Sequence, residues 1–140
     1  MTDGNTQTVL TAMGRFSTGD LEGYLELYDP GIVLHGYGPE PLVGLDAVRG
    51  FYEAIFAAFS DIELVSHDEL VDGDQVATRF TMSATHTGEF WGAPASGVRA
   101  SADGITILRF AGGKCVERWS SFDFLSLLTQ IGALPAPAPA

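Results

Sequence analysis

The chain has 140 residues, and 18 Asp and Glu residues against seven Lys and Arg residues give it a formal net charge of −11. This acidic balance argues against nucleic acid or an anionic membrane as a partner, while the 46% of apolar residues predicts a globular chain with a real core. The single Cys115 excludes an internal disulfide and a cysteine-based zinc site.

Length and terminal composition predict one domain and a cytoplasmic protein. No apolar run approaches the roughly 20 residues that span a bilayer, and the first ten residues lack the basic and hydrophobic regions of a signal peptide. We expect one domain over residues 1–134, followed by a disordered Pro/Ala tail over residues 135–140.

Helices are predicted in the first part of the chain. Residues Thr6–Phe16 carry apolar side chains at helical spacing, and Asp20 is a candidate N-cap for a second helix over Leu21–Tyr28. A short strand, Ile32–Gly36, precedes a Gly- and Pro-rich loop. A wide apolar face then predicts a third helix over about Leu45–Phe59, packed against a sheet.

Strands are predicted in the second part. Ile62–Val71 and Gln75–Thr87 flank an Asp-Gly-Asp hairpin turn, and Val98–Ala102 re-enters the sheet after a loop of small residues. Ile105–Phe110 and Lys114–Phe122 form a last hairpin across an Ala-Gly-Gly turn. Helices followed by long antiparallel strands predict an α+β fold, in which a curved sheet carries helices against one face.

The end of the last strand holds the first candidate for chemistry. Glu117, Trp119, Ser121 and Asp123 share one face of that strand if no bulge intervenes. Asp123 lies where the strand gives way to a short helix, Phe124–Gln130. A lone acid at that junction is either a helix cap or a reactive group in an apolar pocket.

The sequence indicates no cofactor. The three histidines lack a His-x-x-x-His spacing, and nothing resembles an EF-hand loop, a phosphate-binding loop or a dinucleotide fingerprint. A Gly-x-Ser-x-Gly nucleophile elbow is also missing from the sequence. We therefore expect neither a metal nor a nucleotide cofactor.

Short motifs follow one another along nearly the whole chain, from about Val9 to Gly132. They are Tyr28-Asp29-Pro30, Val33-Leu34-His35-Gly36, Gly44-Leu45-Asp46-Ala47-Val48, Phe59-Ser60-Asp61, Gly73-Asp74-Gln75-Val76-Ala77, Thr85-His86-Thr87-Gly88-Glu89-Phe90-Trp91-Gly92, Arg109-Phe110, Gly113-Lys114-Cys115-Val116-Glu117-Arg118-Trp119 and Asp123. Their ordered combination resembles the SnoaL-like polyketide cyclases (ester cyclase family) of the nuclear-transport-factor-like superfamily. The resemblance implies a cone-shaped, curved antiparallel or mixed sheet, three N-terminal helices enclosing an apolar pocket, and a homodimer.

The resemblance also implies catalytic residues. Asp123 takes the place of the acid/base aspartate of the characterised cyclases, and an apolar pocket raises the pKa of a carboxyl group; the alternative is that it caps the helix after it. His35 takes the general-base position of the ketosteroid isomerase branch; the alternative is a histidine bound to loop backbone.

Two further candidates have equally open roles. His86 either binds a substrate oxygen or pins the loop that follows it. Arg109 either neutralises a developing enolate or orients Asp123, or else it pairs with Glu117 across the hairpin. The remaining basic candidates are expected at the surface, His67 in solvent, Arg79 and Arg118 in solvent or against a dimer partner.

The predicted function is cofactor-independent acid/base catalysis, of lyase or isomerase type, on a small hydrophobic carbonyl compound. Aldol-type cyclisation of a polyketide intermediate is the leading reaction. The alternatives are an epoxide hydrolase, a ketosteroid-isomerase-like enzyme on the same fold, or a non-catalytic ligand carrier. Candidate pocket walls for a polyketide-like ligand are Trp91, Trp119, Phe90, Tyr24, Tyr28, Tyr52 and Phe56.

Overall fold

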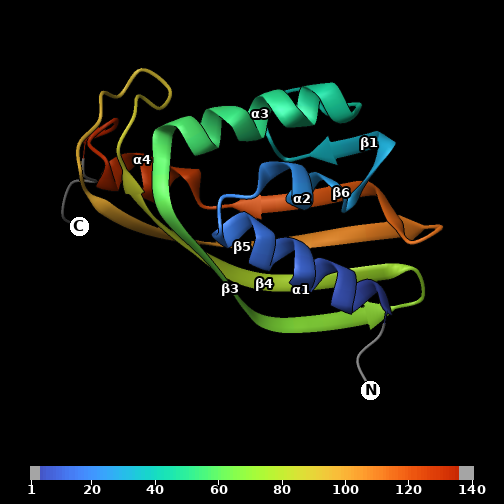
Figure 1. Ribbon diagram of the computed structural model, residues 1–140. Coiled ribbons are helices and arrows are strands. Elements are labelled where there is room, and N and C mark those ends of the chain that lie inside the picture. Colours follow the sequence, from blue (N-terminus) through green and yellow to red (C-terminus); the bar gives the residue numbers. More distant parts are fainter. Residues whose placement is uncertain (1–3, 136–140) are drawn as a thin grey trace.

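A strongly curved six-stranded sheet organises the chain (Figure 1), and the computed structural model describes residues 4–135. The strands are β1 Tyr28–His35, β2 Leu42–Val43, β3 Phe59–Asp72, β4 Gln75–His86, β5 Arg99–Ala111 and β6 Lys114–Phe122. Their spatial order is β2-β1-β6-β5-β4-β3, and every pairing is antiparallel except that of β1 with β6. The expected Pro/Ala tail lies outside the described residues except at Pro135.

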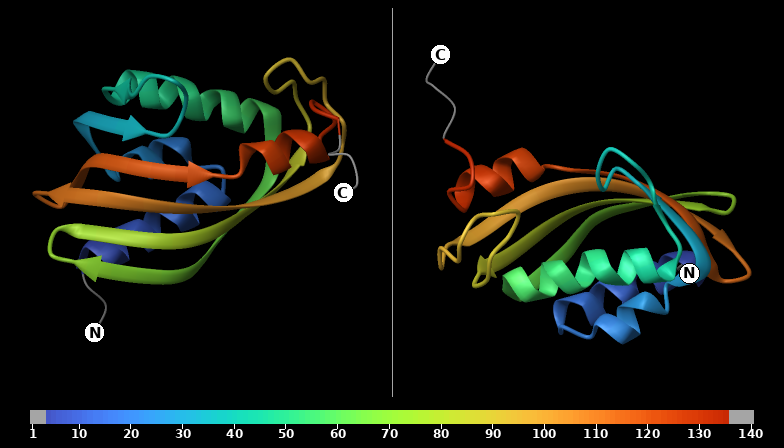
Figure 2. Two further views of the ribbon diagram at one scale, coloured as in Figure 1. Left: turned by 180° about the vertical axis from the view of Figure 1, so that it is seen from behind. Right: turned by 90° about the horizontal axis from the view of Figure 1, so that it is seen from above.

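The helices of the described residues are α1 Gly4–Ser17, α2 Leu21–Leu25, α3 Leu45–Ala58 and α4 Phe124–Gln130. The first three cover the concave face of the sheet (Figure 2). Figure 2 shows α1, α2 and α3 inside the curve and α4 at one end of the sheet, beside the loop that joins β4 to β5. The predicted α+β fold with a curved mixed sheet is confirmed. The three helices of that fold leave out the C-terminal α4, which the sequence predicts separately over Phe124–Gln130. None of the helices within residues 4–135 is long and apolar enough to cross a membrane.

Strict alternation along β4 and β5 separates the two faces of the sheet. Inward positions of β5 such as Leu108 and Thr106 are buried, whereas outward Ile105 and Ile107 are exposed. Because side chains alternate with period two, one apolar face packs against the helices and forms the core.

The second helix is shorter than expected. Leu21–Tyr28 was predicted, but α2 ends at Leu25, and Tyr28 already belongs to β1, paired with Cys115. The Cys115 N–H donates to the carbonyl oxygen of Leu27 at 2.8 Å. Backbone pairing with β6 therefore overrides the helical spacing of the last three residues.

The two predicted strands Val98–Ala102 and Ile105–Phe110 form one continuous strand, β5. The Asp103-Gly104 step between them has the composition of a turn. Gly104 nevertheless stays in the ladder, opposite Phe80 on one side and Phe122 on the other. A Cβ on Gly104 would lie 2.6 Å from Cζ of Phe80, so this glycine makes room for a neighbouring ring rather than for a turn.

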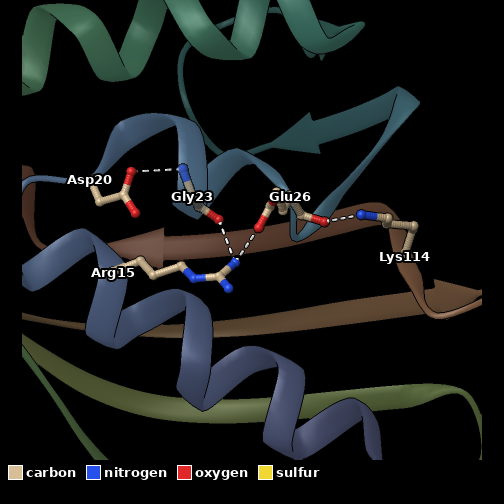
Figure 3. A network of polar contacts seen from close by, with 5 residues as sticks. All are labelled: Arg15, Asp20, Gly23, Glu26 and Lys114. Atoms are coloured by element: carbon tan, nitrogen blue, oxygen red, sulfur yellow. Dashed lines mark hydrogen bonds and ion pairs between the residues drawn. The ribbon is translucent and has the colours of Figure 1, made fainter.

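A polar network ties α1, α2 and the β5–β6 hairpin together (Figure 3). Arg15 donates to the carbonyl oxygen of Gly23 at 3.0 Å and pairs with Glu26, whose backbone carbonyl accepts from Lys114. Asp20 caps α2 by accepting from the Gly23 N–H at 2.9 Å, as predicted from its place in the sequence. The network fixes α2 over the sheet and so positions Tyr24 on its inner side.

Candidate active site

A pocket lies between the helices and the concave face of the sheet, with a cavity volume of about 80 Å³. Its lining residues come from α1, α2, the β1–β2 loop, α3, the three strands β3, β4 and β6, and α4. They are Phe16, Tyr24, Tyr37, Phe51, Tyr52, Ile55, Leu64, Phe80, Met82, Arg118, Ser120, Phe122, Phe124 and Leu127. Apolar and aromatic side chains dominate, with polar groups confined to three tyrosines, one arginine and one serine. Such a lining suits an apolar ligand that is held by a few polar contacts.

The floor of the pocket is built from two stacked phenylalanines. Phe80 of β4 and Phe122 of β6 have ring centroids 6.0 Å apart and an interplanar angle of 6°. Gly104 of β5 lies between their strands and has no side chain, so the two rings cover its backbone. Phe124 packs edge-on against Phe122 at 4.9 Å and extends the aromatic wall toward α4.

The inner face of β6 supplies the polar side of the pocket. Arg118, Ser120 and Phe122 alternate on this face, and Leu108, Thr106 and Gly104 oppose them on β5. Arg118 was expected to face solvent or a dimer partner, and that expectation is wrong. It is partly buried and lines the pocket, because it directly follows the outward Glu117 and successive side chains of a strand point to opposite faces.

The Arg118 guanidinium is held by three hydroxyl groups. Nη1 donates to the Tyr28 hydroxyl at 2.6 Å and to the Tyr24 hydroxyl at 3.0 Å, and Nε donates to Oγ1 of Thr106 at 2.8 Å. These three partners come from β1, α2 and β5. The arginine thus joins the helices to the sheet on the inner side of the pocket.

The tyrosine hydroxyls donate in one direction, away from Arg118. Tyr24 donates to Tyr52 at 3.1 Å, so its 2.6 Å contact with Tyr28 is donated by Tyr28. Tyr52 donates in turn to Tyr37 at 3.3 Å. Each hydroxyl has a single proton, so the direction of one bond sets the direction of the next.

The same chain of donors continues onto the sheet and returns to Arg118. Thr106 donates to the carbonyl oxygen of Trp119 at 3.1 Å, so its 2.8 Å contact with Ser120 is donated by Ser120. The 3.0 Å contact between Tyr37 and Ser120 is then donated by Tyr37. Arg118 therefore polarises both ends of one hydroxyl network, and bonds in such a chain strengthen one another.

The glycine before Tyr37 allows this tyrosine to reach the hydroxyl network. Gly36 follows β1 with φ +93°, and a Cβ there would lie 1.9 Å from the carbonyl oxygen of Ser120. Only glycine accepts both the left-handed conformation and this close approach. The crossing places the Tyr37 ring over Ser120, against Phe51 and Tyr52.

Burial sets the protonation of the network. Desolvation raises the pKa of Tyr24 and raises the pKa values of Tyr28 and Tyr52 well above the usual value for tyrosine, and the Arg118 cation offsets only part of this. Burial alone would lower the pKa of Arg118, but the surrounding tyrosine oxygens outweigh it and raise that pKa well above its usual value. At neutral pH the network consists of neutral hydroxyl donors around a cation.

Asp123 does not line this pocket, and of the two alternatives for it the geometry matches the helix cap. Its side chain is exposed and accepts from the Ser126 N–H at 2.9 Å as the N-cap of α4. The predicted sharing of one face by Glu117, Trp119 and Ser121 is correct, but that face is the outer one. The alternation of side chains along the strand was predictable from the sequence, whereas the face of the strand that meets the helices was not.

His35, Arg109 and Glu117 meet on this outer face. Glu117 Oε2 lies 2.8 Å from Nε2 of His35, and Glu117 Oε1 accepts from Arg109 at 3.1 Å. These contacts, with His35 first, hold the pKa of Glu117 below its usual value. The His35 ring also stacks on Trp119 at 5.6 Å. For Arg109 the alternative of pairing with Glu117 across the hairpin is the one observed.

His86 is completely buried and lines none of the cavities described here. Its Nδ1 accepts from the Ser96 N–H at 3.2 Å and lies 2.9 Å from Ser96 Oγ. Nδ1 is therefore unprotonated, and the proton is on Nε2, which has no hydrogen-bond partner among the described residues. This geometry matches the alternative in which His86 pins the loop after β4.

Of the seven predicted aromatic walls, Tyr24 and Tyr52 line the pocket. Tyr28 is buried behind them in the hydroxyl network. Trp91 is 55% exposed and packs on Phe124 at 4.9 Å, on the rim. The other three lie elsewhere: Phe90 against Phe59, Phe56 against Phe16, and Trp119 on the outer face.

Sequence reasoning missed Arg118, Tyr37, Ser120 and Thr106. The available signal was the period-two rule, which places Arg118 and Ser120 on the same face as Phe122. Within residues 4–135 no group of three or more His, Cys, Asp or Glu side chains is arranged to hold a metal ion.

A curved mixed sheet with helices and a pocket on its concave face defines the nuclear-transport-factor-like class of α+β proteins. The sequence model of the SnoaL-like polyketide cyclases matches residues 7–131. The chain belongs to the SnoaL-like polyketide cyclase family.

Relatives support this assignment. The chain is 30% identical over 119 residues to the aklanonic acid methyl ester cyclase DnrD of Streptomyces peucetius, an alignment that covers 83% of this chain and 78% of DnrD. Among solved structures, AclR from Streptomyces galilaeus is similar with a TM-score of 0.85 and 31% identity, over 96% of this chain and 84% of AclR. TsrD from Streptomyces laurentii has a TM-score of 0.83 and 26% identity, over 96% of this chain and all (100%) of TsrD.

Proposed function

We propose that the chain is a cofactor-independent cyclase that closes a ring in a small hydrophobic polyketide intermediate by an aldol-type addition. Family membership supports a cyclase-type role. The observation that carries the proposal is a cationic hydroxyl network, centred on Arg118, at the polar side of an otherwise apolar pocket. Hydrogen-bond donors held in place in this way stabilise an oxygen on which negative charge develops.

An aldol addition moves one proton from carbon to oxygen. The enolate carbon attacks a carbonyl carbon, the carbonyl oxygen becomes an alkoxide, and this oxygen then takes a proton. Arg118 stabilises the enolate, and Tyr37 is the proposed proton donor to the alkoxide, because it lines the pocket at the end of the tyrosine chain. The water that has accepted the carbon-bound proton returns it to the Tyr37 oxygen, so the addition consumes no net proton, and Tyr52 supports that oxygen by donating to it at 3.3 Å.

The aromatic walls add orientation. Phe80, Phe122 and Phe124 offer flat apolar surfaces on which a polyketide chain can be folded for ring closure. Asp123 and His35 are not part of this scheme, since Asp123 caps α4 and His35 binds Glu117 on the outer face. The proposal therefore replaces the acid/base roles that the family resemblance implies for them.

The second candidate function is a non-catalytic ligand carrier. It is favoured by one observation, that none of the 14 residues lining the pocket is Asp, Glu or His. A carbon acid that is weaker than a 1,3-dicarbonyl needs such a base to lose its proton. In a 1,3-dicarbonyl, stabilisation of the enolate lets water accept the proton, so the cyclase proposal is tied to activated substrates of this kind.

Turnover and binding of an aromatic polyketide methyl ester with an activated 1,3-dicarbonyl separate the two functions. We expect wild type to convert it, Arg118→Gln to lose about 10²–10³-fold in kcat, and the exposed Arg79→Gln to behave as wild type. Binding without conversion in wild type would favour the carrier. Equal turnover by Arg118→Gln and wild type would contradict the assigned role of the network.

We also propose a homodimer formed through the outer face of the sheet. Ile105, Ile107 and Trp119 are 56%, 38% and 37% exposed there, on the two adjacent strands β5 and β6. Light scattering should give twice the chain mass for wild type and a monomer for Ile107→Asp. A cytoplasmic location remains a prediction.

A further inference from the structure

Arg118 is a partly buried cation with no carboxylate partner. Its hydrogen bonds go to three neutral oxygens, those of Tyr24, Tyr28 and Thr106, and no ion pair joins it to an Asp or Glu within residues 4–135. The adjacent Glu117 points to the other face of the sheet, where it binds His35 and Arg109. Because a buried charge without a counter-ion is unfavourable, the pocket is complementary to an anion.

The guanidinium also retains a free donor. Nη1 and Nε are engaged, whereas Nη2 makes no hydrogen bond to the described part of the chain. Arg118 lines both the pocket and a smaller cavity beside α1. The two N–H groups of Nη2 remain for a ligand, and a guanidinium N–H makes strong, charge-assisted hydrogen bonds to the oxygens of an ionised acid.

A second donor, Tyr37, lies midway along the hydroxyl network, between Tyr52 and Ser120. Tyr37 donates to Ser120 at 3.0 Å and accepts from Tyr52 at 3.3 Å, the longest bond of the network. A hydroxyl proton rotates to suit its acceptor. Tyr37 can thus turn its proton to a ligand oxygen, while Arg118 meets the negative charge.

The charge of the whole chain does not oppose this local preference. The net charge is −11, but charges on the surface are largely screened beyond about 8–10 Å at physiological salt. None of the residues that line the pocket is acidic. Selectivity for charge is therefore set inside the pocket, by Arg118.

We infer that the pocket takes ligands whose inward group is an ionised oxygen acid, either a carboxylate or the enolate of an acidic hydroxyquinone or 1,3-dicarbonyl. The inference rests on the proposed function for the choice of pocket, and it adds the charge of the substrate. A cavity of about 80 Å³ encloses such a head group only, so the apolar remainder lies along Phe124 and Trp91 at the rim.

Binding of matched acids and neutral analogues tests the inference without any turnover. The probes are naphthoate against its methyl ester and hydroxynaphthoquinone against its methyl ether, titrated calorimetrically into wild type, Arg118→Gln, Arg118→Lys and Arg79→Gln. The two pairs distinguish a carboxylate from an enolate. Bound hydroxynaphthoquinone is also titrated by its visible absorbance, which reports its ionised form.

We expect wild type and Arg79→Gln to bind one or both acids about tenfold more tightly than the neutral partner, and the pKa of bound hydroxynaphthoquinone to fall by about one unit if the enolate is preferred. Arg118→Gln should lose the preference, and Arg118→Lys should keep part of it. If Arg118→Gln does not fold, the inference is still tested by the affinities of wild type for acid and neutral probes and by the same comparison in Arg118→Lys.

Equal affinities for acid and neutral probe in wild type, no binding of either acid, or a preference that survives in folded Arg118→Gln would each overturn the inference. Preference for the acids without turnover of any polyketide would leave it standing and remove the cyclase proposal. Turnover of a neutral ester without a preference for the acids would leave the cyclase proposal standing and overturn the inference that the ligand is ionised.

Discussion

The role of Asp123 can be decided by two substitutions that separate a helix cap from a catalytic acid. In the structure its exposed side chain accepts one hydrogen bond, from the Ser126 N–H at 2.9 Å, and lies outside the pocket. Asn is as good an N-cap as Asp, whereas Ala is a poor one. We therefore expect Asp123→Asn to retain both stability and turnover, and Asp123→Ala to lose stability alone.

The magnitude follows from the loss of one cap. Replacing an N-cap Asp by Ala costs about 1 kcal/mol of the free energy of unfolding, which lowers Tm by about 2–4 °C for a chain of this size. Asp20 is a matched control because it caps α2 in the same way, accepting from the Gly23 N–H at 2.9 Å. Asp20→Ala should show a similar loss, and Asp20→Asn almost none.

Thermal unfolding by circular dichroism and turnover of a polyketide methyl ester are the two measurements. The cap assignment requires that kcat follow the folded fraction in every variant. A folded Asp123→Asn protein with wild-type Tm and a kcat lowered by about 10²-fold or more, as the loss of an acid/base group would give, would refute it. Asp123 would then have to reach the substrate in a conformation that differs from this one.

Three further predictions concern other groups. Hydrogen bonds, above all with His35, lower the pKa of Glu117, so the stabilising contribution of its carboxylate is present above its unfolded pKa and is lost as pH falls through the folded pKa. The difference in Tm between wild type and Glu117→Gln should therefore shrink from about pH 6 to about pH 3. A difference in Tm that stays constant over this range would contradict the prediction. Burial raises the pKa of Cys115 to about 11, so a thiol reagent at about pH 8 should label only unfolded protein, and rapid labelling of native protein would argue against the buried position. Ser96→Ala removes a hydroxyl contact to His86 and should lower the free energy of unfolding by about 1 kcal/mol with kcat unchanged, whereas a selective loss of kcat would indicate that His86 acts on the substrate.

The outer-face cluster illustrates how a plausible catalytic set can be a surface feature. His35, Glu117 and Arg109 are close together and hydrogen-bonded, as members of an active site often are. Their side chains nevertheless remain about one-third exposed, and none of them lines the pocket between the helices and the sheet. Proximity of titratable groups is therefore weaker evidence for a site than the pocket into which a group points.

Local sequence was sufficient for much of the fold. Periodicity predicted α1, α3 and the long strands, and local composition predicted both the cap at Asp20 and the hairpin turns, because helix faces, caps and turns depend on residues a few positions apart. The order of motifs predicted the family, and with it the curved mixed sheet.

Only the tertiary structure decided which face of β6 lies inside. Alternation separates Glu117 and Trp119 from Arg118 and Ser120 in any strand, but either set could meet the helices until the curvature of the sheet and the position of α2 are known. Apolar content does not decide it either, because each face carries a large aromatic residue, Trp119 on the outside and Phe122 on the inside. The hydrogen-bond partners of Arg118 come from β1, α2 and β5, segments up to 94 residues away in the sequence. A local sequence pattern does not contain these contacts, so it could not predict that Arg118 is the centre of the polar network in the pocket.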